Sequence, residues 1–246
     1  MESLWSRPTE KVSFPKIWSE FTEKESKNSE RLVKYRIQDL PDDRFDDAIQ
    51  HLMEYFLLDA PRSKFFGAAS NKAYVEDYLR PCRWRFPQKT SLVCFREGSD
   101  DIVGLNVNGV AVENDPFGEK VVNATQTDEY RQHMAISSIL YKHVESPFEK
   151  YGIDKYLSCM CLSVTTEYRG LNIGQRLLEA QRPLCKALDI HVIQAIFSSD
   201  SSNHIADRVG FKVESQYTMD QLNQIYPAIP FNKFETKKFS VKSLII

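Results

Sequence analysis

The fold is decided by residues 162–180, which read LSVTTEYRGLNIGQRLLEA. An apolar run ends in a short turn, and a helical pattern follows the turn. This order predicts a β-strand, a tight loop and the first turn of a helix, whose free N–H groups and partial positive charge suit phosphate. Gly170 and Gly174 let the backbone approach a ligand closely, and Asn172 tolerates a left-handed turn. The loop is therefore predicted to bind a pyrophosphate.

Two common phosphate-binding patterns do not fit this loop. It lacks the Gly-x4-Gly-Lys-Ser/Thr run of a P-loop and the three spaced glycines of a dinucleotide fingerprint. It resembles the acetyl-CoA loop of the GCN5-related N-acetyltransferases (the GNAT superfamily), written (Arg/Gln)-x-x-Gly-x-(Gly/Ala). Arg169 and Gly174 match the ends of that pattern, whereas Asn172 stands where the family usually has Gly.

The residues that follow also resemble this superfamily. A β-rich run, His191–Phe197, leads into the Ser/Asn-rich loop Ser198–Asn203. A short helix is expected over His204–Val209, stopped by Gly210, with a strand over Phe211–Tyr217. This is the order in which the GNAT fold completes its cofactor half. The phrase Leu-Ser-Val-x-x-x-Tyr-Arg-Gly and the serine loop are most similar to the insect arylalkylamine N-acetyltransferases.

The resemblance covers about residues 30–246 and is most specific over 157–217. It implies an α/β fold with a central mixed sheet, splayed between two parallel strands and covered by helices on both faces. The strand Leu157–Val164 is apolar on both sides and belongs at the sheet centre. Residues 1–30 are expected to be a polar, partly ordered extension, and residues 31–246 a single N-acetyltransferase domain.

Several other elements are expected from the local pattern. They are strands over 32–37, 91–96, 102–112 and 239–246, a helix from about 42 to 58, a helix over 71–79 that stops near Pro81, a turn over 115–118, and a helix over 125–151 interrupted at Pro147.

Composition excludes several classes of protein. The 246 residues carry 32 Lys+Arg against 34 Asp+Glu, which gives no basic surface for nucleic acid. No apolar run reaches the ~20 residues of a membrane helix, and the first eight residues lack the apolar core of a signal peptide. Cys159 and Cys161, two apart on one strand, are expected on the same face. We expect reduced thiols, no metal site, a cytoplasmic location, and a monomer rather than an oligomer.

Acetyl transfer to an amine requires three kinds of functional group in the protein. An alkylammonium of pKa about 10.4 lies ~4.6 kcal/mol from its free base at pH 7. A base must remove that proton, donors must stabilise the oxyanion, and an acid must serve the departing thiolate. The resemblance implies that the pantetheine arm of CoA lies between strands 157–164 and 191–197. The implied cofactor-binding residues are Leu162, Ser163, Val164, Arg169, Gly170, Leu171, Asn172, Ile173, Gly174 and Ser202.

The catalytic residues depart from the pattern of the insect branch. In that branch the general base is a Glu within an Asp-Glu-Pro motif, and the matching residues here are Asp59-Ala60-Pro61. Asp59 is the remaining base candidate, acting through water, or it is an ordinary helix-end acid. Ser198 and Ser202 match the two serines that the branch uses; alternatively Ser198 ends a strand and Ser202 caps the following helix. Tyr78 falls near a tyrosine of the amine pocket, or packs in the core.

Three other groups remain candidates with plainer alternatives. Residues 82–87 form either a lid over the amine or an ordinary surface loop. His133 and His143 are expected to be solvated or satisfied in the core, and His204 lies on the cofactor side, away from where the amine enters.

The resemblance implies an acetyl-CoA-dependent N-acetyltransferase acting on a small primary amine, of the arylalkylamine or the polyamine and agmatine type, by direct attack in a ternary complex. Its partners would be acyl-CoA and the amine. Two alternatives stay open: a CoA-binding protein with little turnover because of Ala60, and an enzyme that uses a longer acyl-CoA or an amino-acid acceptor.

Overall fold

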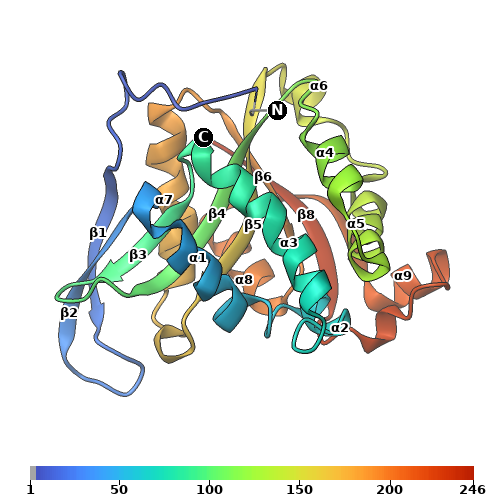
Figure 1. The fold of residues 1–246 in the computed structure, drawn as a ribbon, viewed down its shortest axis with the longest axis horizontal. Coiled ribbons are helices and arrows are strands. Elements are labelled where there is room, and N and C mark those ends of the chain that lie inside the picture. The colour runs from blue at the N-terminus through green and yellow to red at the C-terminus, as the bar shows by residue number, and fades with distance from the viewer. Residues whose placement is uncertain (1–3) are drawn as a thin grey trace.

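An eight-stranded mixed sheet runs through the computed structural model, which describes residues 4–246 (Figure 1). The strand order is β1-β2-β3-β4-β5-β6-β8-β7. Within the described residues β5 and β6 are the one parallel pair, and every other neighbouring pair is antiparallel. The strands are β1 (Ile17–Lys24), β2 (Leu32–Asp39), β3 (Leu92–Arg96), β4 (Ile102–Val112), β5 (Lys155–Val164), β6 (Val192–Phe197), β7 (Lys212–Thr218) and β8 (Lys238–Ile245).

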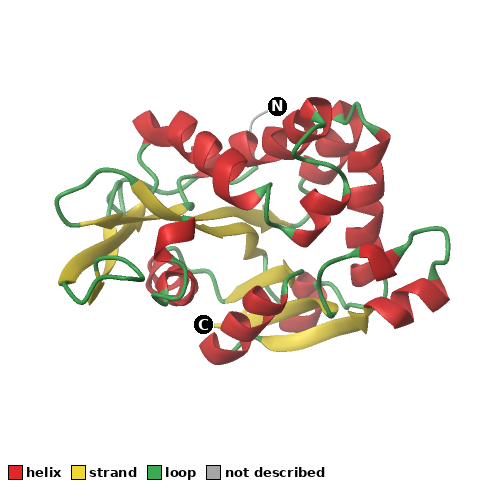
Figure 2. Ribbon diagram, turned by 90° about the horizontal axis from the view of Figure 1, so that it is seen from below, coloured by secondary structure: helices red, strands yellow, loops and turns green. Residues whose placement is uncertain are grey.

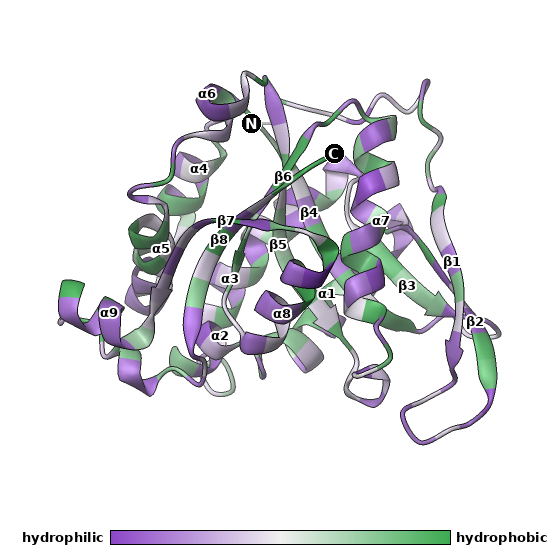
Figure 3. Cartoon of the chain, turned by 180° about the vertical axis from the view of Figure 1, so that it is seen from behind, coloured by the Kyte–Doolittle hydropathy of each residue, from purple (hydrophilic) through white to green (hydrophobic). Residues whose placement is uncertain are grey.

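Helices lie on both sides of the strands (Figure 2). α7 and α8 cover one side of the sheet, where Figure 3 shows them facing the viewer with hydrophilic stretches on their outer surfaces. The opposite side is covered mainly by α1, α3 and α5. The helices are α1 (Phe45–His51), α2 (Pro61–Phe65), α3 (Lys72–Arg85), α4 (Phe117–Ala124), α5 (Asp128–Tyr141), α6 (Pro147–Tyr151), α7 (Ile173–Ala187), α8 (Asp200–Val209) and α9 (Met219–Ile225).

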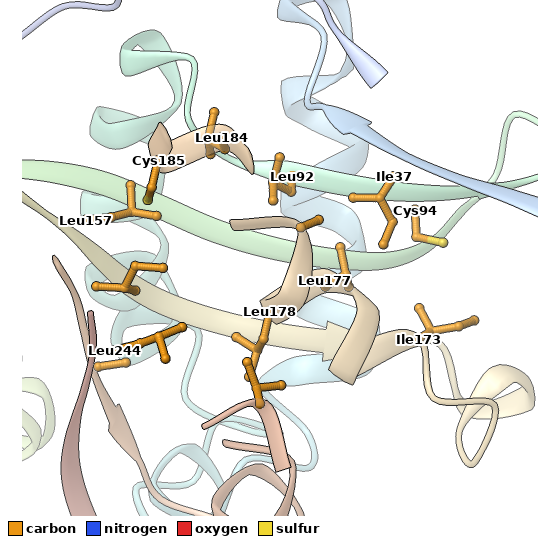
Figure 4. Packing of buried hydrophobic residues seen from close by; sticks show 14 of the residues in the cluster. Ile37, Leu92, Cys94, Leu157, Ile173, Leu177, Leu178, Leu184, Cys185 and Leu244 are labelled. Carbon is orange, nitrogen blue, oxygen red and sulfur yellow. The ribbon is translucent and has the colours of Figure 1, made fainter. Parts of the chain in front are cut away.

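One buried cluster forms where α7 packs on the sheet (Figure 4). Leu177, Leu178 and Leu184 recur at helical spacing and are fully buried. They face strand residues such as Leu92 and Leu157, which are equally buried. Full burial of each leucine contributes roughly 1.5–3 kcal/mol, so this face fixes the position of α7 on the sheet. The start of α7, and the loop before it, are held in place as a result.

The second cluster lies on the other side of the sheet, between the strands and α1, α3 and α5. Helix α1 continues into a π-helical turn, Leu52–Phe56, in which the Leu57 N–H bonds the Leu52 carbonyl at 2.9 Å. Such turns place side chains differently from an α-helix and recur at functional sites. Here the turn carries Tyr55 and Phe56 to the wall of a cavity.

The structure confirms the predicted α/β architecture, including the hairpin β3–β4 and the parallel strands around the predicted loop. It also contains elements that the sequence did not indicate, namely β1, α2, α4 and α9. The turn expected over 115–118 leads directly into α4, and the helix expected over 125–151 is two helices, α5 and α6.

Three further predictions were wrong in detail. Helix α3 runs through Pro81 to Arg85, because burial of Leu79, Cys82 and Phe86 outweighs the lost hydrogen bond of the proline. Helix α8 begins at Asp200 rather than His204, because a capping box starts it earlier. Cys159 and Cys161 lie on opposite faces of β5, in different buried clusters.

The N-terminal residues contact the sheet. Strand β1 pairs with β2 along its whole length, with a register shift near Ile17. Before it, the Arg7 guanidinium forms a buried ion pair with Asp39 on β2 at 2.9 Å. The Asp39 carboxylate also accepts a hydrogen bond from the Trp18 indole at 2.6 Å. The division at residue 30 into an extension and a domain stays a prediction.

Candidate active site

The predicted pyrophosphate loop is a left-handed turn followed by the open first turn of α7. Gly170 and Asn172 have φ values of +87° and +58°, as the sequence predicted for a backbone that turns this tightly. The amides of Arg169 and Leu171 already donate to the carbonyls of Thr166 and Tyr168, at 3.3 Å each. The amides of the first turn, which begins at Ile173, have no intrahelical acceptor and are available to an anion.

The side chain of Arg169 fastens this loop to its surroundings. Its Nε donates to the Val164 carbonyl and its Nη2 to the Tyr55 carbonyl, both at 3.0 Å. Its Nη1 forms an ion pair with Asp59 at 2.5 Å. Arg169 therefore connects the end of β5, the π-helical turn and the segment before α2, and it holds Asp59 beside the loop.

The parallel strands β5 and β6 separate beside this loop. They pair only over Leu157–Cys159 and Ile193–Ala195. Beyond Cys159, β5 stays paired with β4 on its other edge, up to Val164 opposite Gly104. The edge of Leu162, Ser163 and Val164 that faces away from β4 therefore has no strand partner among residues 4–246. Apart from the Val164 carbonyl, which accepts the Arg169 Nε, the backbone groups on this edge are available to an extended ligand.

A β-bulge at Met160 marks the point of separation. Val107 pairs with Cys161 and Asn108 pairs with Cys159, so Met160 is the extra residue on β5. A bulge reverses the alternation of side chains that follow it. This explains why Cys161 contacts Tyr78 and Cys82 on one side of the sheet while Cys159 contacts Asn106 on the other.

The serine loop after β6 forms a capping box at the start of α8. Ser199 is the N-cap, and its hydroxyl accepts the Ser202 amide at 3.1 Å. The Ser202 hydroxyl in turn accepts the Ser199 amide at 3.2 Å. Ser202 is thus the third residue of the helix and not its cap, which corrects the capping alternative. Ser198 and Ser202 both line the cavity described next.

A cavity of about 900 Å³ joins these parts. Its cofactor side is formed by the end of β5, the loop before α7, the end of β6 and the start of α8. Its other side is formed by residues of the π-helical turn, α2, α3 and α5. The predicted site residues that line it are Asp59, Tyr78, Leu162, Ser163, Val164, Arg169, Gly170, Asn172, Ile173, Gly174, Ser198 and Ser202. Leu171 does not line it, since its side chain is buried in the α7 cluster.

The wall opposite the cofactor side is aromatic. Tyr78, Tyr130, Tyr141 and His133 contribute to it, together with Phe56. The Tyr78 hydroxyl lies 3.5 Å from the Cys161 sulfur, and burial raises the pKa of Tyr78 well above its usual value. Burial raises the pKa of Tyr130 and Tyr141 as well. All three hydroxyls are therefore neutral at pH 7 and can donate hydrogen bonds to a ligand.

His133 is a cavity residue that sequence analysis did not single out as functional. Its Nδ1 lies 2.8 Å from the Tyr74 hydroxyl, and its ring stacks on Tyr130. Burial lowers its pKa well below the usual value, helped by the nearby charge of Arg62. The imidazole is therefore neutral at pH 7. In the sequence, the helical spacing of apolar residues in α5 indicates only that position 133 faces inward. It does not show whether such a residue lines a cavity or packs in the core.

His51 supports β5 from outside the cavity. Its Nε2 lies 3.1 Å from the Ser163 hydroxyl, and its ring packs beside Tyr55. Burial lowers the pKa of His51 to about 4, so it is uncharged at neutral pH. Among residues 4–246 no cluster of three His, Cys, Asp or Glu side chains forms a metal site. No helix in this part of the chain is long and apolar enough to span a bilayer.

Comparison with solved structures identifies the family, although no protein-family model matches the chain. The candidate arylalkylamine N-acetyltransferase 7 of the yellow fever mosquito, Aedes aegypti, is 34% identical, with a TM-score of 0.80 over 98% of this chain and 99% of that one. Arylalkylamine N-acetyltransferase 2 of the same mosquito shares 18% identity and a TM-score of 0.72, covering 86% of this chain and 99% of the other. A Drosophila melanogaster polyamine N-acetyltransferase shares 14% identity and a TM-score of 0.68, covering 86% of this chain and all of the other.

The last two likenesses establish the fold, and the first extends over nearly the whole of both chains at an identity that establishes descent. The chain belongs to the insect arylalkylamine N-acetyltransferases of the GNAT superfamily.

Proposed function

We propose that this N-acetyltransferase transfers an acetyl group from acetyl-CoA to the primary amine of a small molecule, by direct attack within a ternary complex. The observation that supports this is the continuous cavity, which reaches from the open turn of α7 to the aromatic wall of α3 and α5. Because both ends open into one space, a thioester and an amine fit side by side. A covalent acetyl-enzyme is then unnecessary.

The residues of the cofactor side suit CoA. The free amides at Ile173 and Gly174, at the positive end of the α7 dipole, would bind the pyrophosphate. Gly174 faces Ile205, Val164 and Leu162, whose nearest atoms would lie 3.4–3.8 Å from an added Cβ. A large side chain there would fill the passage. The unpaired edge of β5 at Leu162–Val164 would bond the amides of the pantetheine arm.

The acetyl carbonyl and the thiolate need donors. Backbone N–H groups on the free edge of β5 would stabilise the oxyanion, because they are fixed before the reaction begins. The Ser198 and Ser202 hydroxyls line the cavity on the other side of the separation, and in this proposal they donate to the leaving sulfur. The Ser202 hydroxyl accepts the Ser199 amide and donates its one proton to the Ser199 carbonyl at 3.0 Å. To donate to the sulfur it would have to release that carbonyl, while the bond from the Ser199 amide keeps its oxygen in position.

Proton removal from the amine is the least conventional part of this site. Ala60, the N-cap of α2, has no group that accepts a proton. Asp59 lies beside it with one carboxylate oxygen engaged by Arg169. We propose that Asp59 receives the proton through water with its other oxygen, while the ion pair with Arg169 holds the carboxylate in position.

The acceptor is proposed to carry an aromatic or extended apolar group, because the wall around Tyr78, Tyr130 and Tyr141 is suited to stacking. The name of the 34% identical mosquito protein agrees with an arylalkylamine. The Drosophila enzyme, which forms N-acetylagmatine, shows that the same fold also serves a polyamine-type acceptor.

The test is release of CoA thiol from acetyl-CoA with a panel of arylalkylamines, polyamines, agmatine and amino acids, repeated with longer acyl-CoA thioesters. We expect saturable turnover that depends on both substrates, with intersecting initial-rate lines. CoA binding without turnover on any acceptor would favour the alternative that Ala60 suggests, a CoA-binding protein. Parallel lines would contradict direct attack.

A further inference from the structure

Arg62, on α2, is a buried cation in the wall of the cavity. Arg62 is only 7% exposed, and it lines the side of the cavity proposed to hold the acceptor. Its Nη2 donates to the His133 carbonyl at 2.5 Å and to the Ser137 hydroxyl at 2.7 Å. Its Nε has no hydrogen-bond partner among residues 4–246. A guanidinium has five N–H donors, so much of its capacity is unused.

Arg62 differs from the other buried cations of the described chain. Arg7 pairs with Asp39 at 2.9 Å, Arg85 with Asp115 at 3.5 Å, and Lys242 with Asp207 at 2.6 Å. Arg62 forms no ion pair with any carboxylate in residues 4–246. A buried charge without a partner costs several kcal/mol, and proteins rarely retain one without use.

The surroundings of Arg62 do not supply the missing negative charge. The titratable groups that face it are the hydroxyls of Tyr74, Tyr78, Tyr130 and Tyr141 and the imidazole of His133, all neutral at pH 7. Within the part of the chain that the structure describes, Asp59 is the only acid lining the cavity, and it pairs with Arg169. The acceptor side of the cavity therefore carries a positive charge that no described protein group balances.

We propose that Arg62 binds a carboxylate on the acceptor, so that the preferred acceptor is a primary amine that also carries an acid group, with an aromatic amino acid as the nearest chemical class. This inference rests on the proposed function, since it names the substrate class of that site. A planar guanidinium suits a carboxylate, which would take up the unused donors. A polyamine would instead bring further positive charge toward Arg62 and be repelled.

The same charge would assist the reaction. The acceptor's own carboxylate favours the ammonium form of its amine, which is the form unable to attack the thioester, and pairing with Arg62 would cancel that effect. This contribution is useful in a site where Ala60 stands at the position of the glutamate that the resemblance implies as general base.

The test compares acceptors that differ only in the carboxylate. The pairs are phenylalanine with 2-phenylethylamine, tyrosine with tyramine, tryptophan with tryptamine, and 4-(2-aminoethyl)benzoate with 2-phenylethylamine. The first three place the acid beside the amine and the last places it at the far end. Each is measured by kcat and KM with acetyl-CoA, and by calorimetric binding in the presence of CoA, which needs no turnover.

We expect the wild-type protein to favour the acid of at least one pair, and Arg62→Gln to raise its KM or Kd by about 10- to 100-fold. The decarboxylated partner should change by less than about threefold. Arg62→Lys should restore part of the affinity, since it keeps the charge but loses the planar fork. Arg85→Gln is the matched control: it removes a buried arginine outside the cavity and should lower stability without altering the preference.

Equal loss for both members of every pair in Arg62→Gln would overturn the inference and leave Arg62 as a structural link between α2 and α5. Preference of the wild type for every decarboxylated amine would also overturn it. Binding of the acids without turnover would instead refute the proposed function and leave the carboxylate site standing. Turnover confined to simple amines would instead support the proposed function and refute the carboxylate site.

Discussion

At position 60 the chain has an alanine where the insect branch it resembles has a catalytic glutamate. The structure places Ala60 at the start of α2, in the cavity wall between Asp59 and Arg62. The neighbours of this residue thus carry an acid held by Arg169 and a cation without an acid. The charges around the proposed amine site therefore differ from those of a site with a glutamate, and the pH dependence of the reaction should report this difference.

Replacing Ala60 by glutamate should therefore raise the rate at neutral pH by about 10-fold or more, because a positioned general base typically contributes 10²–10⁴-fold. The pH profile of kcat/KM should gain an acidic limb that belongs to the new carboxylate. Ala60→Gln is the control of similar size without a base. An unchanged profile in Ala60→Glu would show that another residue already removes the proton.

Ser202→Ala separates a catalytic hydroxyl from a structural one. Loss of the capping-box partner should lower the unfolding free energy by about 1 kcal/mol. Gln221→Ala removes the corresponding third residue of the capping box of α9, outside the cavity, and sets the size of that effect. We expect Ser202→Ala to slow acetyl transfer at least 10-fold and Gln221→Ala to leave it intact. Equal rates in the two variants would assign Ser202 to the helix alone.

His51 makes stability depend on pH in a defined direction. Its pKa is about 4 in the folded protein and about 6.5 when unfolded, so the unfolded chain binds more protons between these values. The stability it contributes is complete above pH 6.5 and is lost as the pH falls toward 4, by at most about 3 kcal/mol. Denaturant unfolding should show a shallower decline in His51→Gln over this range. The exposed His143→Gln should follow the wild type.

At the scale of elements, β5 and α7 form the proposed CoA site. The free edge of β5 exists because β6 pairs with only three of its residues. The first turn of α7 has free amides because no residue of the helix precedes it, and the buried leucines of α7 fix its position beside that edge. Both features were predictable in outline: the run 157–164 is apolar on both sides, and the turn 169–174 contains residues that accept positive φ.

Other elements were not predictable from local pattern. The bulge at Met160 depends on the register with β4, which no local periodicity reports. Helix α3 continues through Pro81 because tertiary burial outweighs a local breaker. Arg62 and His133 line one cavity because of the way α2 packs against α5. Their positions in the sequence do not show that they lie close together.

At the scale of the whole molecule, the two sides of the sheet carry the two halves of the proposed site. The face covered by α7 and α8 carries the groups suited to CoA, and the face covered by α1, α3 and α5 carries the aromatic wall and Arg62. The cavity passes between them where β5 and β6 separate. Filling it at the α7 end should therefore abolish cofactor binding without unfolding either core.

Calorimetric titration of CoA into the wild type and into Gly174→Trp is the most direct measurement of this account. Gly118→Trp is the control, because Gly118 is exposed on α4 and an added Cβ would meet nothing within 4 Å. We expect the wild type and Gly118→Trp to bind one CoA per chain, and folded Gly174→Trp to release no heat. Absence of heat in the folded wild type, or equal binding by Gly174→Trp, would contradict the assignment of the loop before α7 as the site of the CoA pyrophosphate.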